Sequence, residues 1–109
     1  MLFFFLYLTA SAQTVKSNIT LKGSVIDSLT NKPLEYVTVA LQDMKTGLPV
    51  KSTLSNEDGS FVISAAANKT YLLILTCTGY INKRISIINE RYPINIGKVI
   101  LSTSAKQLK

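Results

Sequence analysis

Apolar and polar side chains alternate with a period of two along most of this 109-residue chain. At the first clear example Ile19, Leu21, Gly23 and Val25 share one face, and the residues between them are polar or charged. This spacing is typical of a half-buried β-strand, because successive side chains of a strand point to opposite sides. We find no segment with the 3.6-residue period of an amphipathic helix. The pattern therefore predicts an all-β protein.

Six further segments have the composition of strands, and turn-forming residues separate them. They are residues 36–41, 50–54, 60–64, 71–78, 82–87 and 94–101. Residues 71–75 are apolar on both faces, which predicts a central strand; residues 82–87 are more polar and are expected near an edge. Residues 65–69 are predicted to be a connecting loop, and Gly97 is predicted to mark a bulge. About seven short strands at near-regular spacing predict an antiparallel Greek-key β-sandwich.

The first twelve residues have the features of a secretory signal peptide. The apolar run from Leu2 to Leu8 precedes Ala10-Ser11-Ala12, a small-x-small sequence of the kind that signal peptidase cleaves. No basic residue precedes the run, and a buried N-terminal strand is the alternative interpretation. Seven apolar residues are too few for a transmembrane helix. We therefore expect an exported protein without a transmembrane span in this chain. The expected organisation is a signal peptide at 1–12, a flexible N-terminus at 13–18, the sandwich at 19–101 and a polar tail or linker at 102–109.

Composition excludes several classes of function. The chain has 12 Lys and Arg against 6 Asp and Glu, one cysteine, no histidine and no tryptophan. Without histidine, a Ser-His-Asp triad and a Cys-His pair are impossible, and the common zinc sites lack their ligands. Cys77 has no base to activate it and is expected to be a small buried core residue. We therefore predict no catalytic, cofactor-binding or metal-binding residues and no cofactor.

Two charged features have structural explanations. The segment 56–59 holds two adjacent carboxylates, but a calcium loop needs six to eight oxygen ligands at set spacing, so the segment predicts a hairpin turn with Gly59 at positive φ. Six of the twelve basic residues follow position 82. They suit either a phosphate-binding face or an edge that resists aggregation. Because no RNA-binding aromatic signature accompanies them, we expect no nucleic-acid partner.

Five short motifs follow one another along the chain. Gly23-Ser24-Val25-Ile26-Asp27 comes first, then Pro33-Leu34-Glu35-Tyr36-Val37-Thr38-Val39, then Thr53 with Asp58-Gly59-Ser60-Phe61, then Tyr71-Leu72-Leu73, and finally Thr78-Gly79-Tyr80. In this order they resemble the carboxypeptidase regulatory-like domain, over roughly Ile19 to Leu101. Position 55 departs from the pattern, since it is Ser where the family often has Asp. The glycine that usually precedes Tyr71 is also missing.

The resemblance implies a transthyretin-like β-sandwich that serves as a non-enzymatic accessory or interaction domain. In outer-membrane proteins of Bacteroidetes, such domains precede a TonB-dependent plug and barrel. The implied location is the periplasmic side of the outer membrane or the cell surface, and the implied partner is a protein or an adjoining barrel or plug domain.

Two other functions are related to this architecture. A small carbohydrate-binding module is the alternative function, since starch-binding-like folds share the sandwich. It would bind glycan through exposed aromatics, for which Tyr36, Tyr80 and Tyr92 are the candidates, although Tyr36 and Tyr80 also suit packing. A Lys–Asn isopeptide bond between Lys22 and Asn95, as in some adhesin repeats, is disfavoured because Lys22 falls on a polar face.

Overall fold

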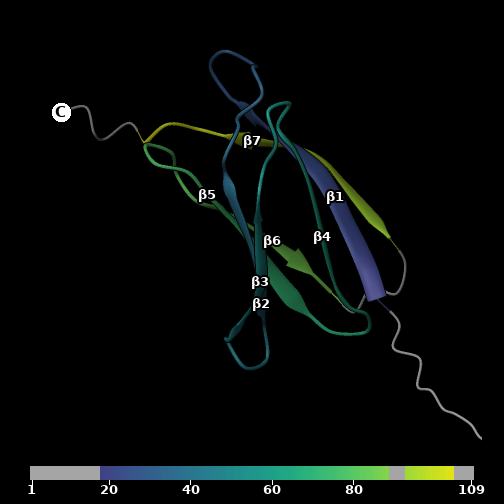
Figure 1. Ribbon diagram of the computed structural model, residues 1–109. Coiled ribbons are helices and arrows are strands. Elements are labelled where there is room, and N and C mark those ends of the chain that lie inside the picture. Colours follow the sequence, from purple (N-terminus) through teal and green to yellow (C-terminus); the bar gives the residue numbers. More distant parts are fainter. Residues whose placement is uncertain (1–17, 89–92, 105–109) are drawn as a thin grey trace, which may run out of the picture.

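The computed structural model describes residues 18–88 and 93–104, which form seven strands in two sheets (Figure 1). The strands are β1 (Asn18–Asp27), β2 (Thr38–Asp43), β3 (Pro49–Leu54), β4 (Ser60–Ala66), β5 (Tyr71–Thr76), β6 (Lys83–Ile87) and β7 (Ile94–Leu101). The predicted all-β fold is confirmed. In the described ranges, no helix is long and apolar enough to span a membrane. The expected signal peptide, Tyr92 and residues 105–109 lie outside the described residues.

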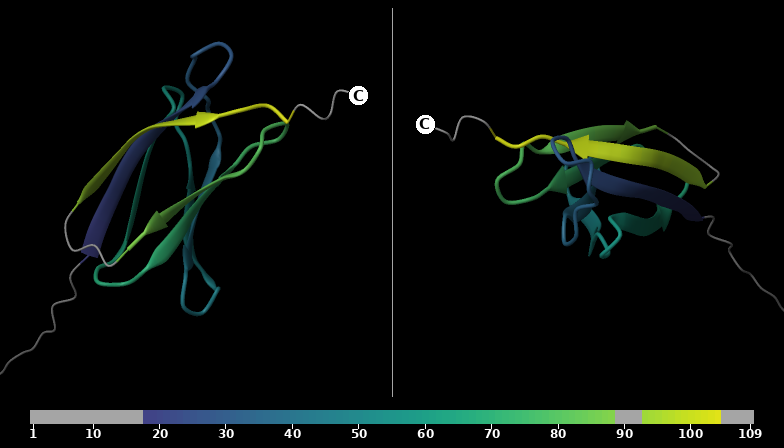
Figure 2. Two further views of the ribbon diagram at one scale, coloured as in Figure 1. Left: turned by 180° about the vertical axis from the view of Figure 1, so that it is seen from behind. Right: turned by 90° about the horizontal axis from the view of Figure 1, so that it is seen from above.

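The two sheets pack face to face as two layers (Figure 2). One has the strand order β4-β1-β7 and the other β3-β2-β5-β6. β2 and β3 pair as one hairpin and β5 and β6 as another, and the remaining connections cross between the sheets. β1 runs antiparallel to β4 but parallel to β7. The sandwich is thus confirmed, and this one pair departs from the antiparallel pattern because β7 arrives from the other sheet and no hairpin joins it to β1.

Strand alternation decides which side chains enter the space between the sheets. All sixteen buried hydrophobic residues of the described chain have odd sequence numbers. They are Ile19, Leu21, Val25, Val37, Val39, Leu41, Phe61, Ile63, Ala65, Ala67, Tyr71, Leu73, Leu75, Ile87, Val99 and Leu101. Each fully buried Val, Leu, Ile or Phe contributes about 1.5–3 kcal/mol relative to an exposed one. This shared core therefore holds the two sheets together.

Most of the local predictions are confirmed. β5 lies inside its sheet and β6 at the edge. Lys22 pairs with Asn95 and Gly23 with Gly97, so the predicted bulge is present, with Ile96 as the extra residue. The predicted loop at 65–69 is wrong at its start, because β4 continues to Ala66. Ala65 is buried opposite Ile19, and a methyl side chain fits the strand as well as it fits a loop.

The end of the chain is tied to the β5–β6 connection. Tyr80 forms an isolated bridge with Thr103. The Ile81 amide donates to the Ser102 carbonyl at 2.8 Å, and the Ser104 amide donates to the Gly79 carbonyl at 3.0 Å. Residues 102–104 are therefore anchored, which the expectation of a tail from residue 102 did not include.

The turn between β3 and β4 has the predicted positive φ at Gly59, but the predicted hairpin is wrong, because the chain crosses here from one sheet to the other and β3 does not pair with β4. Gly59 has a φ of +81°, and its amide donates to the Asn56 carbonyl at 2.9 Å. The carboxylate of Asp58 accepts hydrogen bonds from the amide and hydroxyl of Ser60. A Cβ at position 59 would lie 2.6 Å from the Val25 carbonyl oxygen. The turn therefore requires glycine both for its backbone angle and for its contact with β1.

We predict that Gly59→Ala lowers the free energy of unfolding more than Gly47→Ala does. Gly47 also has a positive φ, +75°, but a Cβ there meets nothing within 4 Å. Its substitution costs only the left-handed backbone, about 1–2 kcal/mol. At Gly59 the clash with β1 adds to that strain, for a total of about 2–4 kcal/mol. Urea denaturation of both variants measures the difference. Equal losses of unfolding free energy in the two variants would mean that β1 moves away from the new Cβ at no cost in stability.

Candidate functional site

The outward faces of the two sheets differ in chemistry. On the three-stranded sheet, the outward side chains are mainly hydroxyl, amide and ammonium groups: Thr20, Lys22, Ser24, Ser60, Ser64, Asn95 and Lys98, with Ile26, Val62 and Ile100 among them. On the four-stranded sheet, most outward side chains of β5 and the middle one of β2 are apolar, and Ser52, Gln42 and Ser86 lie opposite them on the neighbouring strands. A sheet face without a covering layer is usually polar, so this asymmetry singles out the four-stranded sheet.

Four residues form this apolar surface: Ala40, Leu54, Leu72 and Ile74, which we call the apolar face. Ala40 lies directly opposite Ile74, and Leu72 is the next outward residue of β5. Leu54 lies opposite Thr38, one row from Ala40, and is 52% exposed. The strand that looked apolar on both sides in the sequence therefore buries Leu73 and Leu75 and turns Leu72 and Ile74, both half-buried, to the outside.

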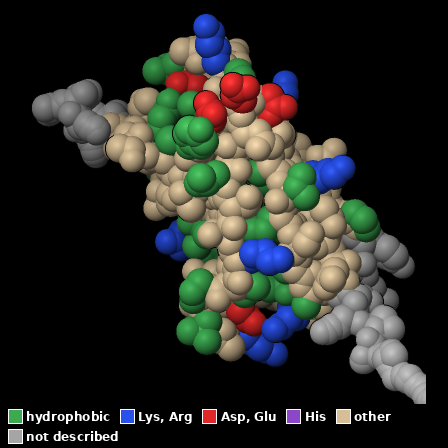
Figure 3. Space-filling view, in the orientation of Figure 1, with side chains coloured by type: hydrophobic (Ala, Val, Ile, Leu, Met, Phe, Trp, Pro, Cys, Tyr) green, Lys and Arg blue, Asp and Glu red, His purple; other side chains and the backbone are tan. Residues whose placement is uncertain are grey.

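Polar and charged groups border the apolar face. Arg84 lies opposite Ile74 on β6, is exposed and forms no ion pair with a described residue. Thr38 and Thr76 lie opposite each other at the other end of the face. Figure 3 shows acidic side chains gathered at one end of the molecule, the upper end in that view. An apolar centre with a polar rim is the usual composition of a protein–protein interface.

Tyr36 stands at the end of β2 next to this face, in an unusual backbone conformation. Its φ is +63° and 69% of its surface is exposed. A left-handed backbone is rare for a bulky residue and costs of order 1–3 kcal/mol. Such strain persists only when neighbouring contacts fix the backbone, and it concentrates at functional sites.

Ser55 supplies those contacts. Its side chain is buried, with the residue only 2% exposed, and its hydroxyl donates to the Leu34 carbonyl at 2.7 Å. The same oxygen accepts from the Val37 amide at 2.9 Å. The Tyr36 amide donates to the Ser55 carbonyl, and the Ser55 amide donates to the Val37 carbonyl, both at 3.0 Å. These four bonds fix the chain on both sides of Tyr36, so its ring projects outward.

A shallow hollow of about 340 Å³ lies beside the ring. It is lined by Tyr36, Thr38, Thr76, Cys77 and Thr78, so hydroxyl groups dominate its wall. Cys77 packs against the core but is only half-buried, which corrects the expectation of a fully buried residue. The β5 strand ends just before it, and the chain turns away at Gly79, which leaves the thiol at the rim of the sandwich.

Tyr80, the second candidate aromatic, is engaged within the domain. Its hydroxyl donates to a carboxylate oxygen of Asp27 at 2.6 Å, and its ring packs against the core. This hydrogen bond, with burial and the Asp27 charge, raises the pKa of Tyr80 to about 12. The same bond, together with the Leu29 amide, lowers the pKa of Asp27 below its usual value. Tyr92 lies outside the described residues, so Tyr36 is the described candidate with a free ring.

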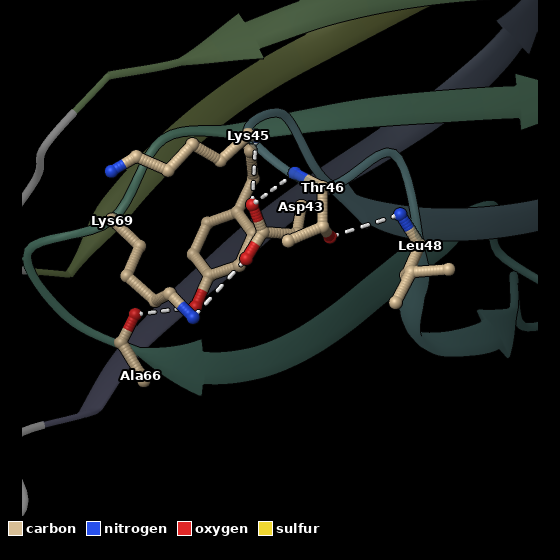
Figure 4. A network of polar contacts seen from close by, with 7 residues as sticks. Asp43, Lys45, Thr46, Leu48, Ala66 and Lys69 are labelled. Carbon is tan, nitrogen blue, oxygen red and sulfur yellow. Dashed lines mark hydrogen bonds and ion pairs between the residues drawn. The ribbon is translucent and has the colours of Figure 1, made fainter.

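A polar network at the opposite end also serves the fold. Figure 4 shows Lys69 reaching from the β4–β5 loop to Asp43, 3.1 Å away, while the amides of Lys45 and Thr46 donate to the same carboxylate. The Lys45 bond, then the Lys69 ammonium, lowers the pKa of Asp43. A hollow of about 290 Å³ lies beside these residues. Because the carboxylate is already satisfied, the network joins two loops and leaves no free acid.

Other sequence-level alternatives find no support in the geometry. Lys22 and Asn95 are register partners in β1 and β7, but both are exposed, whereas an isopeptide bond needs a buried acid beside them. Within the described ranges, no three side chains of His, Cys, Asp or Glu lie close enough together to hold a metal ion. Asp58 uses its carboxylate within the turn. Ser55, in contrast, has a structural role in the hydrogen bonds around Tyr36, which the sequence pattern did not indicate.

Comparison with known proteins identifies relatives by sequence and by fold. The model of the carboxypeptidase regulatory-like domain family matches residues 20–94. No curated protein sequence matches the chain. Among solved structures, the Bacillus anthracis TIE protein has a TM-score of 0.65 at 13% identity, over 94% of this chain and 19% of that one. The chain thus spans about a fifth of the TIE protein's length.

Two further similar structures differ from each other in function. The C-terminal domain of the shaft pilin spaA from Lactobacillus rhamnosus GG has a TM-score of 0.57 at 16% identity, over 82% of this chain and 100% of that one. The 3-chlorocatechol 1,2-dioxygenase from Rhodococcus opacus 1CP has a TM-score of 0.57 at 11% identity, over 83% and 62%. At these identities the likeness concerns the fold alone.

We predict that Ser55→Ala lowers the free energy of unfolding by about 1–3 kcal/mol, the cost of leaving a buried polar group without a partner. The Leu34 carbonyl and the Val37 amide lose their hydroxyl partner in this variant. Ser52→Ala is the matched control, since Ser52 is exposed on β3, and it should change stability by less than about 0.5 kcal/mol. Chemical denaturation compares them. A neutral Ser55→Ala would show that backbone bonds alone hold Tyr36.

The Tyr80–Asp27 bond predicts a pH dependence with two limits. Tyr80 has a raised pKa, so its stabilising effect is complete below pH 10.0, its ordinary pKa, and is lost as pH rises to about 12. Asp27 has a lowered pKa, so its effect is present above 3.8 and is lost at lower pH. We expect the stability difference between wild type and Tyr80→Phe to be constant from about pH 5 to 9 and to shrink above pH 10. Denaturation midpoints across this range test it; a difference unchanged at pH 12 contradicts it.

Proposed function

Because the chain belongs to the carboxypeptidase regulatory-like domain family, we propose that it is a non-catalytic, exported domain that docks against another protein. The observation that carries the proposal is the apolar face on the outside of the four-stranded sheet. Contiguous apolar surface on a soluble domain usually marks an interaction site, because exposing it to water is unfavourable. The outward face of the three-stranded sheet, which is mainly polar, is the face with which the apolar face is compared in the experiment below.

The chemistry of the face defines its partner. Ala40, Leu72 and Ile74 match an apolar surface on the other side, and Arg84, which has no ion-pair partner among the described residues, matches an acidic group at the rim. A partner of this kind is a folded protein domain with an apolar centre and acidic border. In the context that the family resemblance implies, it is the plug or barrel domain of a TonB-dependent or related outer-membrane protein. The apolar run with its small-x-small site supports export to the periplasmic side of that membrane.

The titratable groups support a role without catalysis. General acid–base work near neutral pH needs a group whose pKa lies near 7. The chain has no histidine, and hydrogen bonds lower the pKa of Asp27, Asp43 and Asp58 away from that range. The dioxygenase neighbour shares the fold at 11% identity, which carries no chemistry to this chain.

Glycan binding is the second candidate, and one observation favours it. Tyr36 presents an exposed ring beside a hollow whose wall holds the hydroxyls of Thr38, Thr76 and Thr78. A sugar could stack on the ring and bond to these hydroxyls. The apolar face next to the hollow has no role in that mode. Protein docking accounts for both, since Tyr is also a common interface anchor.

Site-specific photo-cross-linking in the bacterial envelope tests the docking proposal. A photoreactive residue at position 74, in the apolar face, is compared with one at position 100, which lies on the outward face of β7 in the other sheet and is at least as exposed. We expect position 74 to cross-link to the plug or barrel domain of an outer-membrane protein, identified by mass spectrometry. Position 100 should give no such product. Absence of a product at position 74, or equal products at both, overturns the proposal.

Tyr36→Gly separates binding from folding in the same assay. Glycine accepts a positive φ without strain, so we expect this variant to be more stable than wild type by about 1 kcal/mol. It should also weaken the cross-link at position 74, because the projecting ring is lost. Calorimetry against a glycan panel distinguishes the alternative. A dissociation constant below about 100 μM, or roughly −5.5 kcal/mol, that Tyr36→Ala abolishes and Tyr80→Phe does not would favour the carbohydrate module.

A further inference from the structure

The two sheets have four edge strands, and three of them are protected against pairing with another strand. Edge strands carry unpaired backbone groups, which proteins shield with charge, proline, bulges or short length. β3 begins with Pro49 and carries Lys51. β6 has five residues and two cations, Lys83 and Arg84. β7 carries Lys98 beside its bulge.

β4 has none of these devices. Its seven residues, Ser60–Ala66, include no charged side chain and no proline. Its register with β1 is regular over seven pairs, without a bulge. Val62, next to the middle residue of the strand, is 52% exposed. β4 is therefore a long, regular and uncharged edge, of the kind that natural proteins either protect or use.

Hydrogen bonds show which backbone groups of β4 point away from β1. The Gly59 carbonyl accepts from the Val25 amide of β1, so the odd-numbered residues that follow face β1. Ser60 faces the other way, since its carbonyl accepts from the Asn56 amide and its own amide donates to Asp58. The even-numbered residues of β4 therefore present their backbone to the open side.

Two residues on that side keep free groups. The Ala66 carbonyl accepts from the Tyr71 hydroxyl at 2.8 Å, and the Ser60 groups are engaged in the turn. Val62 and Ser64 lie between them. The alternation of the β1–β4 ladder turns their backbone amides and carbonyls away from β1, and these groups form no hydrogen bond to a described turn or loop. Two donors and two acceptors thus lie in a row at the centre of an uncharged edge.

We propose that β4 pairs antiparallel with β4 of a second copy of this chain, with Val62 of each copy opposite Ser64 of the other. Residues of a hydrogen-bonded antiparallel pair exchange both of their backbone bonds. In this register Val62 of each copy forms such a pair with Ser64 of the other copy. The two pairs together use every free backbone group at the centre of both strands. A shift of two residues would instead place the engaged groups of Ser60 opposite Ser64. The pattern of free groups therefore selects the register.

The side chains agree with this arrangement. Val62 lies beside the hydroxyl of Ser64 on the outer face, and Ile63 lies beside its own copy on the inner face, so no like charges meet between the paired strands. The product is one six-stranded sheet, β7-β1-β4-β4-β1-β7, closed by a two-fold axis. Its ends are the two β7 strands, which Lys98 and the bulge protect, so growth stops at the dimer. The apolar face lies on the other sheet, so this inference is independent of the proposed docking.

The oligomeric state tests the proposal, with the full chain purified after export from a bacterial host. We expect sedimentation equilibrium to give twice the mass of one chain for wild type. Val62→Lys, which adds the missing edge charge, should give a monomer with unchanged circular dichroism. Ile100→Lys is the matched control, because Ile100 is 48% exposed on the outer face of the same sheet, and it should stay dimeric.

Hydrogen exchange identifies the strand involved. We expect the amides of Val62 and Ser64 to exchange slowly in the wild-type dimer and at least tenfold faster in Val62→Lys. A monomer at all concentrations overturns the proposal and leaves a peptide from another protein as the occupant of the edge. A dimer that survives Val62→Lys, or one in which these two amides exchange freely, overturns it as well.

Discussion

Every buried apolar side chain of the described domain belongs to one core between the two sheets, on a strand or, for Val37 and Ala67, directly beside one, and this shared core constrains the rest of the structure. Neither sheet has a second buried layer, so each strand has one face to bury and one to present. Each loop has to start the next strand so that its apolar side chains again point inward. This holds from Ile19 to Leu101. The outward-facing side chains do not have to pack in the core, and it is in these side chains that the two sheets differ.

The strain at Tyr36 depends on that core through one buried hydroxyl. Ser55 lies in the first turn after β3, and its inward side chain reaches the chain on both sides of Tyr36. The hydroxyl replaces hydrogen bonds that a regular strand would supply, and the ring is turned outward as a result. A serine hydroxyl both donates and accepts, so it satisfies a carbonyl and an amide together, whereas an ionised Asp at this position would only accept.

The sequence predicted the strands, the bulge and the tight turn because each depends on local spacing or on a residue with special backbone freedom. Alternation identified the inward faces of β1 and β2, and the Asp58-Gly59 pair identified the turn. The parallel pairing of β1 with β7 is different in kind, because it depends on how a connection crosses between sheets. The Ser55 bonds and the position of Leu54 opposite Thr38 depend on contacts between segments that are distant in the chain. Alternation also failed where alanines have no strong preference, at Ala65 and Ala66.

The parallel pair of β1 and β7 in the three-stranded sheet has a mechanical consequence. β1 opens the domain and β7 closes it, and the two lie side by side in the same direction over seven register pairs. A pull on Asn18 and Leu101 in opposite directions would therefore slide the two strands along each other. Such a load falls on all of the bonds between them at once, whereas a hairpin pulled at its two ends opens one bond at a time. The bonds of residues 102–104 to the β5–β6 connection lengthen the anchored region at the trailing end. A domain tethered at both ends is in this way built to resist tension before it unfolds.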